Sequence, residues 1–261
     1  MVKYLNATSV LLLLVSFAAF TCAISPLKNY PATSSHQQQQ PMHTCCMPRQ
    51  HTFHFEGSKT MLENCNGMNC NSGFGVFRQR HMPDFYNRRY RLDSRIEING
   101  QLVVDNTVMG FMDPYPSSFG VEYTFNGTSC SCRKLTKQGE MLMVTCVEFD
   151  FDFEGDIAIG IETEDHVKAQ KFVRRKQVNS NTTEIDTLIV QPIQRKAPPL
   201  PYPDPYPCFY DCAIISMEGK TQVVDSNGGM ISVSSYSGGS WNFKPFNTDA
   251  DYVIPSYCQK C

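Results

Sequence analysis

The sequence predicts an all-β fold made of antiparallel strands. Along the 261-residue chain, stretches in which apolar and polar residues alternate recur every 8–12 positions, separated by residues that favour turns. Two dipeptides that accept positive φ, Asn99-Gly100 and Asn126-Gly127, are typical of hairpins. The clearest alternating stretches are residues 74–78, 88–92, 95–98, 121–125, 156–161 and 187–190.

The first 23 residues have the features of a secretory signal peptide. An apolar run over residues 11–20 follows Lys3, and Thr21-Cys22-Ala23 supplies small residues at the cleavage point. A membrane anchor is the alternative, but this run is shorter than the roughly 20 apolar residues that span a bilayer, and no later segment approaches that length. We therefore expect residues 1–23 to be cleaved from a secreted, extracellular protein with no transmembrane segment.

Two breaks in composition divide the remaining chain. Residues 24–44 lack apolar periodicity and predict a flexible tail, so that residues 45–261 form a single β domain. Inside it, the proline-rich stretch 197–207 must run extended, and we expect it to connect two parts of one sheet sandwich. Residues 166–177 are compatible with a helix, but their alternation fits a strand equally well, so we expect at most a short helix.

The cysteine content indicates a disulfide-bonded protein. The chain has 12 cysteines, of which 11 remain once Cys22 leaves with the signal peptide, and most should pair in an oxidising compartment. An odd number leaves one thiol either buried and inert or joined to a second chain as a homodimer. The remaining cysteines are Cys45, Cys46, Cys65, Cys70, Cys130, Cys132, Cys146, Cys208, Cys212, Cys258 and Cys261.

Charge and short motifs narrow the class of partner. Without the leader the chain carries 22 basic and 25 acidic residues, whereas nucleic-acid binding requires a concentrated basic surface. We therefore expect no nucleic-acid partner.

Two Asn-X-Ser/Thr sites in turn-like sequence, at Asn126 and Asn181, predict N-glycosylation.

Phenylalanines and acids alternate strictly over residues 148–154. In a strand, this alternation places the phenylalanines on one face and the acids on the other. Because each fully buried phenylalanine contributes roughly 1.5–3 kcal/mol, the aromatic row is expected to line a solid core or the wall of an apolar cavity. That row consists of Phe149, Phe151 and Phe153.

The acids of the same segment are candidate calcium ligands. Carboxylates about 7 Å apart along one strand face repel each other unless cations lie nearby, and calcium prefers such oxygen ligands. A solvated acidic edge that discourages aggregation is the alternative. The candidate ligands are Asp150, Asp152 and Glu154.

Catalytic motifs are absent from the sequence. It has no Gly-X-Ser-X-Gly elbow, no His-Glu-X-X-His and no glycine-rich phosphate loop, so we expect a protein that is not an enzyme. His51 and His54 look like a metal pair, but positions i and i+3 of a strand point to opposite faces, so we expect ordinary surface histidines. Trp241 and Phe243, two residues apart, are expected to share one strand face and to fill a core or contact a ligand.

Several short motifs spread over residues 45–261 follow one family pattern. Cys46-Met47-Pro48-Arg49-Gln50 and Phe55-Glu56-Gly57 match an opening Cys-X-Pro-X-Gln followed by Trp-Glu-Gly, and residues 87–91 match a basic strand. Glu122-Tyr123 with Cys132-Arg133-Lys134-Leu135 match the next hairpin. The matches end at Phe243, Asp249 and residues 253–258, as a closing strand with Pro-X-X-Cys. Together these motifs resemble the ependymin family of secreted ependymin-related proteins.

The resemblance implies two stacked, curved antiparallel sheets that form a half-open sandwich with an apolar pocket, as in the bacterial lipoprotein carriers. It further implies a homodimer, N-glycosylation, calcium association and a lipid-like ligand. It pairs Cys45 or Cys46 with Cys208 or Cys212, and Cys130 or Cys132 with Cys258. The chain departs from the family in its doubled Cys45-Cys46, its local Cys65 and Cys70 and its extra Cys146, which leaves the partner of Cys261 open.

Two functions follow from these observations. The first is a secreted carrier that binds a fatty acid or other lipid between its sheets, with Phe149, Phe151, Phe153, Trp241 and Phe243 as the candidate ligand-binding residues. Pockets of this kind bind by burying apolar surface, and few polar groups are needed to set orientation. The alternative is an extracellular-matrix or cell-adhesion protein that acts through calcium and glycan surfaces. No organic cofactor is expected for either.

Overall fold

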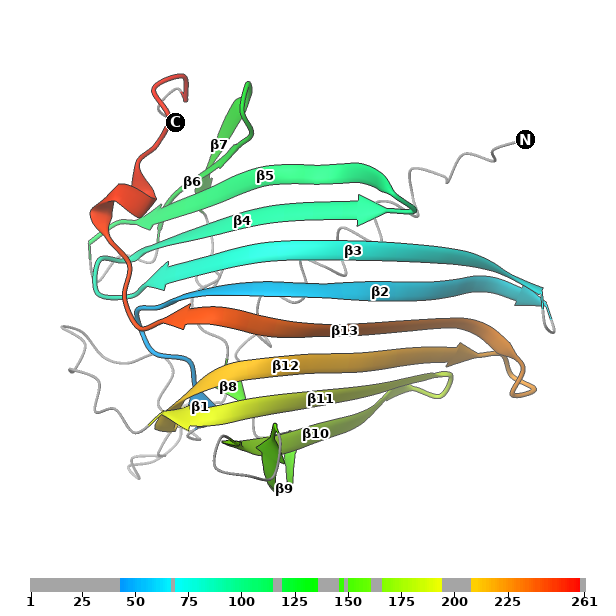
Figure 1. Ribbon diagram of the computed structural model, residues 1–261. Helices are drawn as coiled ribbons and strands as arrows, with labels where there is room; N and C mark the ends of the chain where they lie inside the picture. The colour runs from blue at the N-terminus through cyan, green and yellow to red at the C-terminus, as the bar shows by residue number, and fades with distance from the viewer. Residues whose placement is uncertain are drawn as a thin grey trace, which may run out of the picture.

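In the part of the chain that the structure describes, the fold consists of thirteen strands and one short 3-10 helix (Figure 1). The computed structural model describes residues 43–66, 69–114, 119–135, 146–147, 150–160, 166–193 and 208–258. The strands are β1 (His43–Cys46), β2 (Thr52–Asn66), β3 (Asn69–Asp84), β4 (Arg89–Ile98), β5 (Gln101–Met112), β6 (Gly120–Phe125), β7 (Cys130–Leu135), β8 (Cys146–Val147), β9 (Asp152–Ile159), β10 (Val167–Asn179), β11 (Thr182–Ile193), β12 (Cys208–Val224) and β13 (Met230–Lys244), followed by η1 (Asp249–Tyr252).

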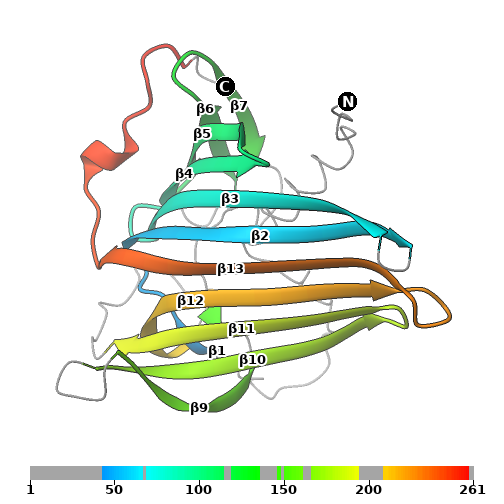
Figure 2. The same cartoon turned by 45° about the vertical axis from the view of Figure 1, so that its right-hand side comes forward.

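The strands form one large sheet in the order β7-β6-β5-β4-β3-β2-β13-β12-β11-β10-β9, with β1 beside β12 and β8 beside β1. Apart from the parallel β1–β12 pair, the pairings are antiparallel. The all-β, antiparallel prediction is thus confirmed. The structure has one continuous hydrogen-bonded sheet where two separate sheets were expected. Figure 2 shows the β4–β7 end of this sheet turned away from the plane of β13, β2 and β3.

The two hairpin signals give two different turns. Asn99 and Gly100 have φ values of 50° and 77°, the geometry of the tight two-residue hairpin that joins β4 to β5. The β6–β7 turn instead spans Asn126 to Ser129, where the amide of Asn126 donates to the carbonyl of Ser129 at 3.0 Å. Neither Asn126 nor Gly127 adopts positive φ, because the side chain of Asn126 itself accepts the turn's hydrogen bonds.

Curvature of the sheet brings its two halves into one apolar core. We call the face that carries Phe55 and Phe77 the interior face and the opposite one the outer face. Buried residues of β2–β4 and of β10–β12 belong to the same cluster, although β13 separates the two sets of strands. The cluster includes Phe53, Phe55, Met61, Phe77, Ile96 and Ile98 on one side and Phe172, Leu188, Val190 and Ile214 on the other.

Disulfides fasten β1 into this core. Cys45 and Cys46, which have no exposed surface, bond to Cys212 in β12 and to Cys146 in β8 respectively. β1, the first strand that the structure describes, begins at His43, two residues before the expected boundary at Cys45. Within the described ranges, no helix is long and apolar enough to cross a membrane.

The segment after β13 crosses the outer face and covers a second apolar cluster (Figure 1). Tyr252 in η1 donates its hydroxyl to the carbonyl of Met82 at 2.8 Å. Further along, Ile254 packs against the cluster that contains Met109 and Tyr123. Residues 253–258, expected as a closing strand, form no strand, since side-chain packing and a disulfide at Cys258 hold them against the sheet.

Candidate functional site

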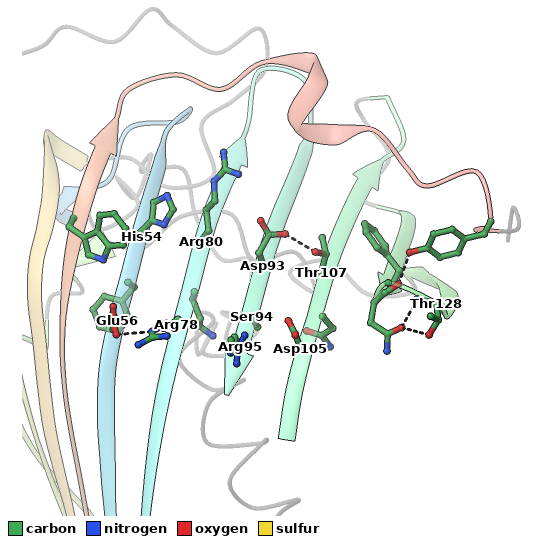
Figure 3. A pocket seen from close by; sticks show the side chains of 18 residues that line it. His54, Glu56, Arg78, Arg80, Asp93, Ser94, Arg95, Asp105, Thr107 and Thr128 are labelled. Carbon is green, nitrogen blue, oxygen red and sulfur yellow. Dashed lines mark hydrogen bonds and ion pairs between the residues drawn. The ribbon is translucent and has the colours of Figure 1, made fainter. Parts of the chain in front are cut away.

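A groove of about 730 Å³ runs across the outer face (Figure 3). Strand register builds it from two neighbouring rows of side chains, because residues directly opposite each other in paired strands share a face. The first row, from β13 to β6, is Trp241, His54, Arg80, Asp93, Thr107 and Phe125. The second row, from β2 to β5, is Glu56, Arg78, Arg95 and Asp105. We call this site the outer groove.

Ion pairs fix the charged side chains of the outer groove. Arg78 donates from Nε to Oε1 of Glu56 at 2.7 Å, and Arg80 donates from Nη2 to Oδ1 of Asp251 at 3.2 Å. Asp93 accepts from Oγ1 of Thr107 at 2.7 Å. Guanidinium and carboxylate groups thus compensate each other along the groove instead of forming a field of one sign.

The C-terminal segment forms the far wall of the outer groove. The hydroxyl of Tyr257 donates to the backbone carbonyl of Asn126 at 2.5 Å. The disulfide between Cys130 and Cys258 holds the same segment to β7. The glycosylation candidate Asn126 therefore lies at the rim of the groove, beside Thr128 of its own Asn-X-Thr motif (Figure 3).

A β-bulge places Trp241 and Phe243 on opposite faces of the sheet. The prediction that Trp241 and Phe243 share a face is wrong, because the β13–β2 register shifts between Trp241 and Lys244 and Asn242 adopts a φ of 55°. Trp241, opposite His54, lies on the outer face, where 53% of it is exposed. The extra residue after it turns Phe243 to the interior side, where Phe243 packs against the core. Asparagine tolerates this left-handed conformation better than most residues.

His51, just before β2, and His54, in β2, lie on opposite faces of the sheet, as their spacing predicts. His54 lies against Trp241 with ring centroids 4.4 Å apart; partial burial and the nearby charges of Arg80 and Lys244 lower its pKa. His51 lies on the interior side, 1% exposed, so its assignment as a surface histidine is wrong. Its Nδ1 contacts the carbonyl oxygen of Pro48 at 2.6 Å, and its ring stacks with Phe53 and Phe243, which accounts for its burial.

The aromatic row of residues 149–153 does not reach the outer groove. Phe149 lies outside the described residues. Phe151 precedes β9 and packs against the interior core. Phe153 faces Phe172 across β9 and β10 with centroids 5.5 Å apart, yet 54% of it is exposed. β9 lies at the edge of the sheet, with no second described strand beside it.

The acids of this segment have basic partners. Glu154 accepts from Arg175 at 2.6 Å and from Lys171 at 2.9 Å, and these bonds lower its pKa. Asp150 pairs with Arg174 at 3.3 Å, and Asp152 is exposed. Among the residues that the structure describes, no group of three metal-ligating side chains is assembled. Calcium at Asp150, Asp152 and Glu154 stays a prediction.

The remaining sequence candidates are distributed as follows. Asn181 lies in the β10–β11 turn, where its backbone amide is held by Asn179. Cys65 bonds to Cys70 across the β2–β3 hairpin, and Cys132 is also disulfide-bonded. The bonds Cys45–Cys212 and Cys130–Cys258 are among the pairings implied by the resemblance, whereas Cys46–Cys146 is not. Cys261, the signal peptide and the proline-rich stretch lie outside the described residues.

The interior face is the second candidate site. Phe55 lies over Gly238 and Phe77 lies over Gly57, so closely that a Cβ atom at either glycine would approach the ring to within 2.7 and 2.6 Å. The two rings stack with centroids 5.5 Å apart. The two buried rings, with Phe55 7% and Phe77 4% exposed, form the apolar floor of this face.

Comparisons with known proteins do not identify the chain. No family model matches it, and no curated protein matches it. One solved structure, described as "lipid-protein interactions in lipovitellin", matches with 8% identity and a TM-score of 0.27. That match covers 81% of this chain and 28% of the lipovitellin chain, so this chain spans less than a third of the matched structure.

The outer groove was missed by sequence reasoning, although a signal for it exists. Four of its strands each carry two polar residues at positions i and i+2, such as His54 and Glu56 or Arg78 and Arg80. This spacing places each pair on one face. Whether the pairs align across strands depends on register, which single-strand patterns do not specify.

Proposed function

We propose that this protein is a secreted glycoprotein of ependymin type that carries a fatty acid or another hydrophobic ligand against its interior face. The observation that supports the proposal is the floor of Phe55 and Phe77 over glycines, continuous with the apolar residues of β10–β12 in one cluster. Such a surface gains affinity by removing apolar area from water, at about 0.8 kcal/mol per buried methylene.

A cation on the same face offers a partner for the polar end of the ligand. Lys59 lies opposite Tyr236 in β13, two residues before Met61 on the interior side of β2. Burial lowers the pKa of Lys59, and Lys59 itself is 7% exposed. An ammonium group beside apolar side chains suits a ligand with a carboxylate head and a hydrocarbon tail.

Native mass spectrometry of protein from its own source tests the proposal. We expect a discrete added mass of lipid, and displacement of a fluorescent fatty acid from the delipidated protein. Met217→Trp fills space on the interior face next to Leu188, so it should abolish displacement. Ser216→Trp, one residue away on the outer face, should preserve it. No lipid mass together with no displacement contradicts the proposal.

A second experiment separates recognition of the ligand's charged head from recognition of its hydrocarbon tail. Lys59→Met should weaken binding of a fluorescent fatty acid by about tenfold and leave binding of the matching fatty alcohol unchanged, because only the acid carries a charge to pair. Equal losses for both ligands would show that Lys59 does not pair with the carboxylate, and no loss for either would place Lys59 outside the binding site. The homodimer implied by the resemblance is tested separately by light scattering with and without a reductant.

A further inference from the structure

We propose that the outer groove is a binding site for a neutral oligosaccharide. The site is separate from the lipid-carrying interior face, since its side chains lie on the other side of the sheet. The volume of about 730 Å³ falls within the range of roughly 300–1,000 Å³ that small-molecule sites occupy. Nothing in the proposal depends on whether the interior holds a lipid.

The length of the outer groove points to an extended ligand. Its first row begins at Trp241 in β13 and ends at Phe125 in β6, five strand spacings away. At about 4.8 Å per spacing this is about 24 Å, the reach of roughly four or five linked sugar rings. The open polar floor between the two aromatic ends contacts such a ligand along one side.

Trp241 supplies the stacking surface that sugars require. It is the sole tryptophan of the chain, is 53% exposed and is supported by the imidazole of His54 at 4.4 Å. Its register partner in β2 is His54, so strand alternation places both side chains on the outer face. The C–H face of a pyranose is apolar and packs on an indole ring as other apolar groups do.

Charge balance selects a neutral ligand. The groove is lined by three arginines and three acids, with Arg78 bonded to Glu56 and Arg80 to Asp251. A sulfated or phosphorylated chain needs an excess of positive charge, which this arrangement does not provide. Sugar hydroxyls donate and accept, so they suit a surface that alternates carboxylates with guanidinium groups. Arg78 uses only Nε toward Glu56, which leaves its Nη donors for a ligand.

Two sources supply this chemistry: a glycan from another molecule, or the chain's own N-glycan on Asn126 at the rim. The carbonyl oxygen of the Asn126 side chain accepts from the amide of Ser129 at 2.9 Å. That bond uses the side-chain oxygen and not the amide nitrogen, which is the atom that carries an N-glycan. A glycan attached there begins at the rim of the outer groove.

Intrinsic fluorescence tests the proposal, because the single tryptophan reports from the site itself. The Asn126→Gln variant, made in a secretory host, is titrated with chitotetraose, cellotetraose, the pentasaccharide core of N-glycans and a heparin tetrasaccharide. We expect a saturable change with at least one neutral sugar and none with heparin. Calorimetry on Asn126→Gln carrying Trp241→Phe or Arg78→Gln should show at least tenfold weaker binding. Adding Phe153→Ala, an exposed aromatic on the far edge, should leave the affinity unchanged.

Three results overturn the proposal: no response to any neutral sugar, a response to heparin alone, or undiminished affinity in both groove variants. Arg78 is exposed, so its variant remains informative if Trp241→Phe fails to fold. The glycosylated wild-type protein then separates the sources. If free sugar changes its fluorescence only after endoglycosidase treatment, the groove holds the chain's own glycan. If it responds before treatment, the ligand comes from another molecule.

Discussion

Arg89 donates from Nε to Oδ2 of Asp84 at 2.9 Å, and the carboxylate of Asp84 has no exposed surface. The same guanidinium donates to Asp249 at 2.6 Å and lies 4.1 Å above the ring of Tyr252. One arginine therefore joins the β3–β4 turn to the C-terminal segment that walls the outer groove.

Arg89→Met is expected to lower the free energy of unfolding by about 3 kcal/mol, because it leaves the buried Asp84 carboxylate without its cation. Adding Asp84→Asn should recover part of this loss, since the buried charge is then removed. Arg95→Gln breaks an exposed pair with Glu97 and should cost less than about 1 kcal/mol. Urea denaturation measures all three, and a double variant no more stable than Arg89→Met would contradict the explanation.

The disulfides should contribute unequally to stability. Cys46–Cys146 closes a separation of 100 residues and Cys65–Cys70 one of five. Loop-closure entropy predicts about 4.7 kcal/mol for the first bond and about 2 kcal/mol for the second. We expect the Cys46→Ser/Cys146→Ser protein to melt well below the Cys65→Ser/Cys70→Ser protein in calorimetry. Equal melting temperatures would show that loop length does not set the stabilisation that each disulfide contributes.

Acid should destabilise the protein through His51. Burial lowers the pKa of His51 to about 4 from 6.5, so the folded protein holds a neutral imidazole that the unfolded chain protonates more readily. Stability is therefore fully present above about pH 6.5 and falls as the pH drops toward 4, by up to about 1.4 kcal/mol per pH unit.

Urea denaturation across this pH range checks the effect. His51→Gln should be less stable at neutral pH, because it loses the ring stacking with Phe53 and Phe243, but its stability should fall less steeply with acid. His166→Gln, at an exposed position, should keep the wild-type slope. An unchanged slope in His51→Gln would exclude His51 as the acid-sensitive group.

Gly57 should tolerate no side chain. A Cβ atom there would lie 2.6 Å from the ring of Phe77 and 2.7 Å from the backbone of Gly238, so Gly57→Ala must push the strands apart. We expect a cost of about 1–3 kcal/mol, typical of overpacking, measured by thermal unfolding. Gly127→Ala, with open space around it, should leave the melting temperature within about one degree of wild type.

Several local features were predictable because they depend on neighbouring residues alone. Asn99-Gly100 specified a tight turn that needs positive φ at both positions. The alternation of residues 166–177 fitted a strand as well as a helix, and the structure has strand β10 there. The relation of Trp241 to Phe243 was not predictable, since the bulge at Asn242 reflects how β13 meets β2 rather than any preference of the tripeptide.

By itself, the amino-acid sequence determined the antiparallel β class, the candidate disulfide cysteines and the opposite directions of His51 and His54, because alternation along a strand is a local property. The tertiary structure decided the pairing of Cys46 with Cys146, the flat packing of Phe55 and Phe77 over glycines, and the alignment of charged pairs into the outer groove. Each of these joins residues far apart in the chain, and register and curvature, which set such contacts, arise only when all the strands pack together.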